Sequence, residues 1–220
     1  MGVGGGMGAI RITDVTAGVR IAAPGLMPLR PTLDMWIELI RRYARSQDDA
    51  AYWYCETANA GLLASAACAA GHIGLAEYVA DKKNGQGRAD IYITHARRRS
   101  EFALVLEAKQ VFPESGYRPS VGDTLEWAAS DARHSNRSVR FRAGVAFATV
   151  KLAPTVTPAV TAGAVRAFLH DCHALAPDAM AWAFPHIHDP KVAPERSRAG
   201  RSFQWPGIAA LFRIATAPAG

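Results

Sequence analysis

Cysteine and long apolar runs are what this sequence has least of. Its three cysteines, Cys55, Cys68 and Cys172, include no CxxC pair. This sparse set argues against a disulfide framework and suits a reducing compartment. No segment approaches the roughly 20 apolar residues that a membrane-spanning helix needs, and the glycine-rich start lacks the basic and apolar regions of a signal peptide. We therefore expect a cytoplasmic protein that does not enter a membrane.

Two common classes of catalytic or binding motif are also missing. The sequence has no Gly-x-Ser-x-Gly elbow and no plausible Ser/His/Asp order, so acyl hydrolysis has little support. The GVGGGMG segment near the start is glycine-rich, but no Gly-Lys-Ser/Thr follows it and no strand precedes it. A phosphate-binding loop of the P-loop type is therefore not indicated.

The composition is that of a folded, basic domain. Half of the residues are hydrophobic, which is enough for a substantial core, and 220 residues fit one compact domain. The formal net charge is +6. A basic balance favours an anionic partner such as nucleic acid, because lysines and arginines displace the counterions around phosphates. Many proteins are mildly basic without such a partner, so charge alone leaves both interpretations open.

Hydrophobic periodicity predicts helices and strands in mixed order. We expect residues 1–30 to form a flexible lead with one short strand near 10–12, and residues 31–220 to form a single domain. Helices are predicted from residue 32 with Thr32 as N-cap, over 51–70, from residue 123 with Asp123 as N-cap, and over 162–175. Strands are predicted over 75–82, 88–94, 102–106, 139–150, 179–184 and 208–214, with a hairpin turn at Asn84-Gly85 and a long loop over 186–201. The fold class is thus α/β, a mixed central β-sheet flanked by helices.

One predicted strand ends in charged residues. The apolar run 102–106 is followed directly by Glu107, Ala108 and Lys109. Because side chains alternate along a strand, Glu107 and Lys109 project from the same face, and Asp90 on the neighbouring predicted strand can point to that face. Carboxylates are costly to bury side by side unless a divalent cation compensates their charge. Oxygen ligands without histidine or cysteine favour Mg²⁺ or Mn²⁺.

The order of an aspartate, a gap and then Glu-x-Lys at a strand end resembles the PD-(D/E)xK nuclease superfamily, which has the restriction-endonuclease-like fold. The resemblance covers about residues 50–150 and includes the order of helix, strand hairpin, motif strand, helix and strand. The sequence departs from the motif at Ala89, which stands before Asp90 in place of proline. The resemblance does not explain the chain beyond residue 150.

The resemblance implies a role for each residue of the motif. Asp90 and Glu107 would be metal ligands, the backbone carbonyl of Ala108 would assist them, and Lys109 would be the catalytic lysine. Many members of the superfamily carry a further acid on the helix before the strands. Glu56 fits that place and would bind a second ion or a hydrated metal.

Further polar residues could contact the substrate. Gln110 follows the catalytic lysine directly and could touch a phosphate or a water molecule. Basic residues near the motif strand could line a groove for nucleic acid, although each could equally be part of a solvated turn. The arginines assigned to nucleic-acid binding are Arg97, Arg98, Arg99, Arg137 and Arg140.

The sequence therefore predicts a Mg²⁺-dependent nuclease that hydrolyses the phosphodiester bonds of nucleic acid, DNA being the expected substrate. Self-association or a protein partner is compatible with this prediction. A catalytically silent binding or accessory protein on the same fold is the competing interpretation. A zinc-dependent hydrolase is a third, because His170, His173, His186 and His188 form two short clusters, although a helix end and a solvated loop also account for them.

Overall fold

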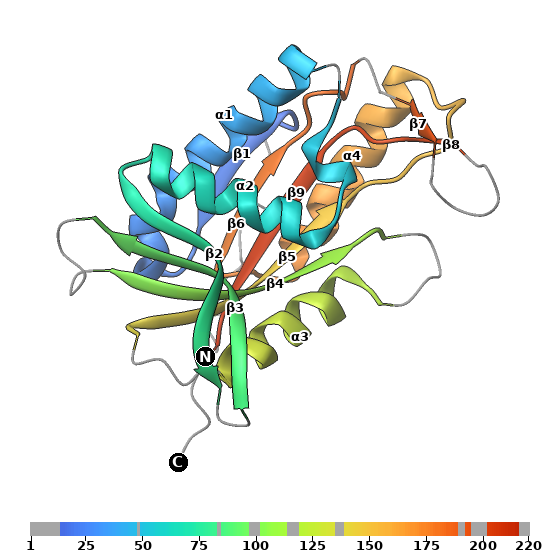
Figure 1. Cartoon of the computed structure of the whole chain (residues 1–220). Helices are drawn as coiled ribbons and strands as arrows, with labels where there is room; N and C mark the ends of the chain where they lie inside the picture. Colours follow the sequence, from blue (N-terminus) through green and yellow to red (C-terminus); the bar gives the residue numbers. More distant parts are fainter. Residues whose placement is uncertain are drawn as a thin grey trace, which may run out of the picture.

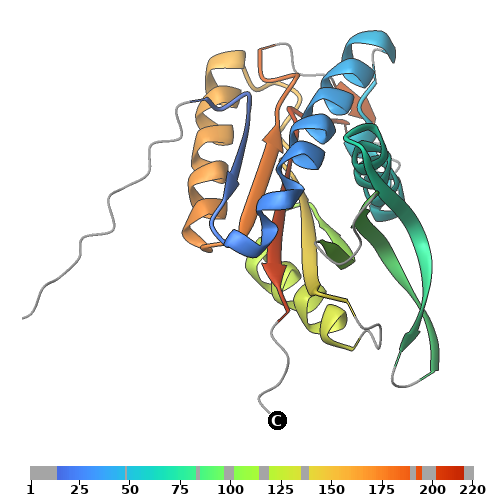
Figure 2. The same ribbon diagram turned by 90° about the vertical axis from the view of Figure 1, so that its left-hand side faces the viewer.

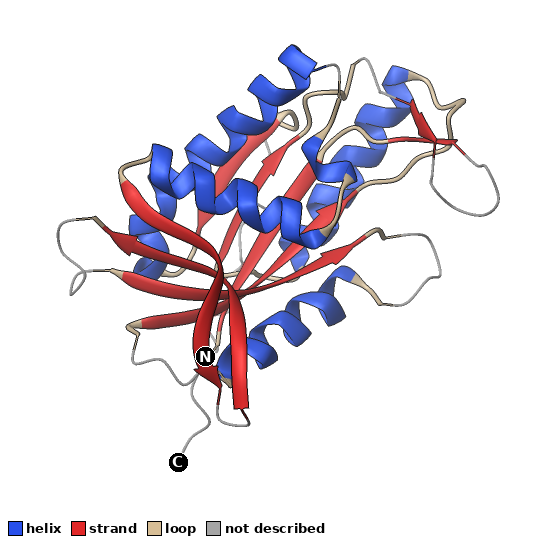
Figure 3. Ribbon diagram, viewed as in Figure 1, coloured by secondary structure: helices blue, strands red, loops and turns tan. Residues whose placement is uncertain are grey.

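The computed structural model describes residues 14–47, 49–82, 85–96, 102–113, 119–134, 139–188, 192–194 and 202–215. A seven-stranded mixed sheet with the strand order β1-β6-β9-β5-β4-β3-β2 forms its centre, and four α-helices flank the sheet (Figures 1 and 3). The predicted α/β class with a mixed central sheet is thereby confirmed.

The sheet has one parallel pair, β4 with β5, and its other pairs are antiparallel. Its strands are β1 (Ala17–Ile21), β2 (His72–Lys82), β3 (Gly85–His95), β4 (Ala103–Val111), β5 (Phe141–Thr149), β6 (Ala179–Ala183) and β9 (Ile208–Ile214). The helices are α1 (Arg30–Gln47), α2 (Glu56–Ala69), α3 (Val121–Arg133) and α4 (Pro158–Ala174), with short 3-10 helices at Pro24–Leu29 and Ala51–Trp53. A separate two-stranded sheet joins β7 (Val192–Pro194) to β8 (Ser202–Gln204).

Two apolar layers hold the helices to the sheet. Helices α1 and α2 cover one face, where Trp36 and Leu63 pack in a cluster with Phe147 of β5. Helices α3 and α4 lie on the other face (Figure 2), where Leu125 and Leu169 pack in a second cluster. Burying each such side chain contributes about 1.5–3 kcal/mol, so these layers are the main source of stability. Within the described residues, no helix is both long enough and apolar enough to cross a bilayer.

The helix starts differ from those that the sequence predicted. Helix α1 begins at Arg30, and Thr32 is not its N-cap but a buried residue that hydrogen-bonds Nδ1 of His72 at 2.9 Å. Helix α3 is capped by Ser120 rather than by Asp123. The Ser120 side chain accepts the backbone N–H of Asp123, and the Asp123 carboxylate accepts the backbone N–H of Ser120, which is a capping box. Helix α2 begins only at Glu56, after a 3-10 turn.

The first and last parts of the chain also depart from the expectation. Strand β1 pairs with β6 at one edge of the sheet, so a flexible lead up to residue 30 is wrong for residues 17–30. The short strand expected near residues 10–12 lies outside the described residues. The loop expected over 186–201 contains β7. The hairpin is confirmed, because Lys82 pairs with Gly85, but Gly85 is the first residue of β3 rather than part of the turn; Asn84 lies outside the described residues.

Candidate active site

Strand β4 is paired along one edge and only partly along the other. On the β5 side, pairing runs from Leu104 to Val111. On the β3 side, it runs from Ala103 to Leu106 only. Beyond that point β2 and β3 continue as a two-stranded ribbon that leaves the sheet (Figures 1 and 2). From Ala108 onward, this edge of β4 is therefore free of strand pairing, and its backbone groups need other partners.

Two carboxylates pair with this open edge. Oδ2 of Asp90 accepts the backbone N–H of Ala108 at 2.6 Å, and Oε2 of Glu56 accepts the backbone N–H of Gln110 at 3.1 Å. In a strand, the N–H and the C=O of one residue point to the same edge. The carbonyl of Ala108 therefore lies on this open edge together with its N–H. Each hydrogen bond uses one of the two oxygens of its carboxylate.

An interruption in the hairpin accompanies the placement of Asp90. Pairing between β2 and β3 is broken at the level of Glu77 and Asp90, and Glu77 has φ 52°, in the left-handed region. The regular alternation breaks here: Ala89 packs with Tyr92, whereas Ile91 packs on the opposite face of the sheet. Strict alternation over the predicted strand 88–94 would place Ala89 and Ile91 on one face, and the structure places them on opposite faces. The Asp90 carboxylate lies against the backbone of β4 rather than standing simply on one face.

Glu107 and Lys109 lie on the face of β4 that α3 covers. Glu107 is only 3% exposed, and Nζ of Lys109 lies 3.2 Å from Oδ2 of Asp131 on α3. Gly144 of β5 is the register partner of Glu107. A Cβ at Gly144 would lie 2.1 Å from the backbone nitrogen of Ala129, so the helix backbone rests directly on the sheet at this point. The missing side chain thus brings α3, and with it Asp131, close to the charged end of β4.

The charges of the site influence one another. Burial raises the pKa of Glu56, and Asp90 and Asp131 raise it further, against the opposing effects of Lys109 and of the hydrogen bond from Gln110. Burial lowers the pKa of Lys109, but the hydrogen bond and charge of Asp131, together with Glu56 and Asp90, outweigh it and the net pKa is raised. Lys109 therefore remains an ammonium at neutral pH, whereas Glu56 resists deprotonation.

The side chain of Gln110 is held by two residues that sequence reasoning gave no role. Its Oε1 accepts a hydrogen bond from Nδ2 of Asn59, and its Nε2 donates to the carbonyl oxygen of Tyr52, both at 3.4 Å. Asn59 is fully buried and lies one turn after Glu56 on α2. This helical spacing from Glu56 was enough to mark Asn59 as a candidate site residue in the sequence. Asp131, by contrast, is an acid on a helix surface far along the chain, and nothing local marks it.

One of the arginines proposed to bind nucleic acid, Arg140, lies within the described residues, and it is not at this site. Arg140 stands directly before β5, with its guanidinium carbon 5.4 Å from the centroid of the Phe141 ring. Phe141 pairs with Leu104 in the parallel register, so Arg140 lies at the opposite end of these strands from Lys109. The remaining predicted arginines lie outside the described residues: Arg97, Arg98, Arg99 and Arg137.

No ready-made metal cage is present in the part of the chain that the structure describes. There, no three His, Cys, Asp or Glu side chains form a group that could hold a metal ion. His170 is 83% exposed beside Asp171, whereas His186 is buried, and these histidines do not form a zinc site. Glu56, Asp90 and Glu107 likewise do not form a group close enough to hold a metal ion. A cation would therefore have to draw these carboxylates together.

Comparisons of the chain with protein-family models, with curated proteins and with solved structures find no match. Function is therefore inferred from these side chains and from the sequence motif.

Proposed function

We propose that this chain is a Mg²⁺-dependent nuclease that hydrolyses phosphodiester bonds of nucleic acid, with DNA as the expected substrate. One observation carries the proposal. The carboxylates of Asp90 and Glu56 bind backbone N–H groups two residues apart on the open edge of β4, and Lys109 lies between those two residues in the sequence. An aspartate, a second acid and a lysine are thus combined at the end of one central strand.

The donor atoms fit a hard divalent cation. Carboxylates and a backbone carbonyl are the ligands that Mg²⁺ and Mn²⁺ prefer. The raised pKa of Glu56 is caused in part by neighbouring carboxylates, a repulsion that a cation would relieve. Asp90, Glu107 and the carbonyl of Ala108 would hold the ion, and Glu56 would bind a second ion or a metal-bound water molecule. When bound, Mg²⁺ supplies Lewis acidity that lowers the pKa of a bound water and neutralises phosphate charge.

The chain supplies a fixed positive charge beside these carboxylates. The ion pair with Asp131 steadies the Lys109 ammonium, which can orient the attacking water or donate to a phosphate oxygen as negative charge develops there. Asn59 and Tyr52 hold the Gln110 side chain, which limits movement of the β4 edge. In the reaction the water oxygen bonds to phosphorus while the bond to the leaving oxygen breaks; the attacking water loses one proton and the leaving oxygen takes one up, so that protons balance.

A second candidate function is a silent nucleic-acid-binding or accessory protein. It is favoured by the 3.2 Å ion pair between Lys109 and Asp131, because this pair and the two carboxylate–backbone hydrogen bonds give Lys109, Asp90 and Glu56 partners within the protein itself. In this case the charges would complete the open edge of β4 and do no chemistry.

Substitution of the lysine separates the two functions. Plasmid and single-stranded DNA are incubated with the wild type and with Lys109→Ala, in Mg²⁺, in Mn²⁺ and in chelator, and cutting is followed on gels. We expect metal-dependent cutting by the wild type and a loss of at least about 100-fold in the variant, because a preorganised charge at the transition state is worth roughly that factor.

Arg45→Ala, which removes one exposed positive charge from α1, is the matched control and should cut like the wild type. Circular dichroism would show that both variants are folded. If the folded wild type cuts no substrate in either metal, or if Lys109→Ala cuts normally, the nuclease proposal fails.

A further inference from the structure

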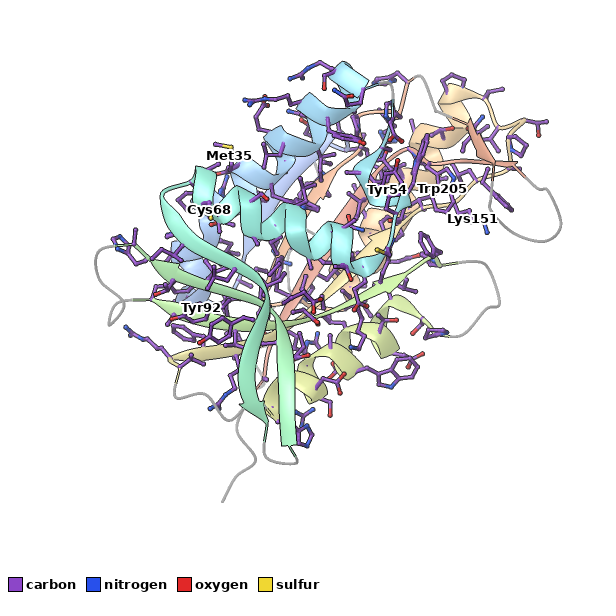
Figure 4. The ribbon with its side chains drawn as sticks, in the orientation of Figure 1. Met35, Tyr54, Cys68, Tyr92, Lys151 and Trp205 are labelled. Atoms are coloured by element: carbon purple, nitrogen blue, oxygen red, sulfur yellow. The ribbon has the colours of Figure 1, made fainter. Side chains whose placement is uncertain are left out.

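A strip of three aromatic rings and one lysine lies at the end of the sheet where β4 and β5 finish. Phe112 meets Trp205 edge to face at 5.2 Å between centroids, and Trp205 meets Phe203 in the same manner at 6.5 Å. Nζ of Lys151 stands 3.8 Å from the centroid of the Phe203 ring. Figure 4 labels Lys151 and Trp205, which lie near one another on this side of the molecule. We refer to these four residues as the aromatic strip.

The aromatic strip is buried at Trp205 and partly exposed to solvent at Phe112. Trp205 is only 7% exposed and supports the other rings, whereas Phe112 is 37% exposed. A phenylalanine that follows a buried strand and leaves a third of its surface in water gives up part of the free energy that burial would provide. Its open surface is therefore a candidate for contact with a ligand.

Backbone hydrogen bonds fix the strip before any ligand arrives. Leu152 and Gln204 form a β-bridge, with N–H to carbonyl distances of 3.0 and 2.8 Å, and this bridge holds Lys151 beside Phe203. The Gln204 side chain donates to the carbonyls of Pro154 and Val156, which ties the same segment down. A fixed aromatic surface loses little conformational entropy on binding.

The strip is connected to the candidate active site through Tyr52. The Tyr52 hydroxyl donates to the carbonyl of Trp205 at 2.9 Å, and its own carbonyl accepts from the Gln110 side chain at 3.4 Å. Phe112 follows Gln110 by two residues. A strand of nucleic acid that leaves the carboxylates along β4 would therefore meet the strip next.

We propose that the aromatic strip binds an unpaired strand of nucleic acid, with a base stacked on Phe112 and a phosphate near Lys151. This inference rests on the proposed function, and it makes single-stranded or frayed nucleic acid the preferred substrate. Bases within a duplex are stacked on one another, so only an unpaired base offers a free face to an aromatic side chain. The nearby lysine and the net charge of +6 complement the phosphates.

Binding by the full chain, measured in chelator so that nothing is cut, tests the proposal. Fluorescence anisotropy is recorded with a labelled 15-nucleotide oligothymidylate and with a duplex of equal length. We expect the single strand to bind more tightly than the duplex, and Phe112→Leu to weaken single-strand binding about tenfold, since one stacked base accounts for a factor of this order. Lys151→Ala should reduce the salt dependence of binding by about one phosphate contact.

The choice of variants separates stacking from folding. Phe112→Leu keeps apolar contact with Trp205 but removes the flat ring, and Trp127→Ala removes a 54% exposed ring from α3 as the matched control. If the duplex binds as tightly as the single strand, or if Phe112→Leu binds like the wild type, the inference is overturned.

The two proposals can also fail separately. If the protein binds single strands through Phe112 but cuts nothing, the binding role of the aromatic strip stands and the nuclease proposal fails. If cutting depends on Lys109 but Phe112→Leu binds like the wild type, the nuclease proposal stands and the binding role of the aromatic strip fails.

Discussion

Strands β4 and β9 both lie inside the sheet, yet β9 is apolar over most of its length whereas β4 carries charged residues near its end. Strand β9 is paired with β5 on one side and with β6 on the other, and residues 208–212 are fully buried and apolar. Strand β4 loses its β3 partner after Leu106 and from that point carries Glu107, Lys109 and Gln110. Where strand pairing stops, backbone N–H groups require acceptors, and carboxylates can supply them. The polar site thus begins where the pairing of β4 with β3 ends, while the pairing of β4 with β5 continues to Val111.

Making β4 more like β9 should abolish cutting. In Glu107→Gln the buried side chain, 3% exposed, keeps its shape but can no longer carry a negative charge. We expect cutting to fall by at least about 100-fold, because a metal ligand is lost. The two quantities measured are the rate of cutting of single-stranded DNA and the circular dichroism spectrum, which shows whether the variant is folded.

Glu38→Gln, at an exposed position on α1, is the control and should change neither quantity. If Glu107→Gln leaves cutting intact, Glu107 is not part of the machinery.

A side chain at Gly144 should loosen the contact that places α3 against the charged end of β4. The new Cβ would lie 2.1 Å from the backbone nitrogen of Ala129, so helix or strand must shift. We expect Gly144→Ala to lower the free energy of unfolding by about 1–3 kcal/mol, and a shift of α3 to weaken the Lys109–Asp131 ion pair. Thermal unfolding followed by circular dichroism measures the loss.

Gly61→Ala is the matched control, because no atom lies within 4 Å of its added Cβ. There the same substitution in the interior of α2 should stabilise the protein by about 0.5–1 kcal/mol. Equal effects at the two glycines would contradict close packing of α3 on Gly144.

The smallest expected effect is on the pH dependence of stability. The pKa of Glu56 is raised in the folded protein above its ordinary value of 4.5, chiefly by burial, so the folded state holds this proton more tightly than the unfolded chain does. Stability should therefore decline as the pH rises from 4.5 through the raised pKa. Glu56→Gln should remove that part of the decline, which melting temperatures in chelator across this pH range would reveal.

Added Mg²⁺ should oppose the decline in the wild type, because the ion binds the deprotonated carboxylate. Parallel pH curves for the wild type and for Glu56→Gln would argue against a proton held at Glu56.

Those parts of the fold that local pattern determines could be predicted from the sequence. The apolar run before Glu107 predicted a buried strand, the turn at Asn84-Gly85 predicted the hairpin, and the bounds of β9 agree with the prediction. Alternation also placed Glu107 and Lys109 on one face, as their common position on the α3 side of β4 shows.

What could not be predicted depends on contacts between distant residues. The placement of Asp90 against the β4 backbone accompanies a left-handed residue at Glu77, which no sequence pattern announces. The partner of Lys109 is Asp131, an acid that looks like any other on a helix surface. The N-cap of α3 was misassigned because Ser120 with Asp123 and Asp123 with Glu126 have the same spacing, so the local pattern fitted both.

The amino-terminal strand has a consequence for the order of assembly. Strand β1 pairs only at the far edge of the sheet, where Ala17 faces Ala183, and Trp182 covers Gly18 while its indole N–H donates to the carbonyl of Asp14 at 3.0 Å. Strand β1 is made before its docking partner β6, and strands β2 to β5 all lie between the two in the sequence. Closing so long a loop is slow, which makes the seating of β1 a late step in folding, with Trp182 fluorescence as its natural reporter.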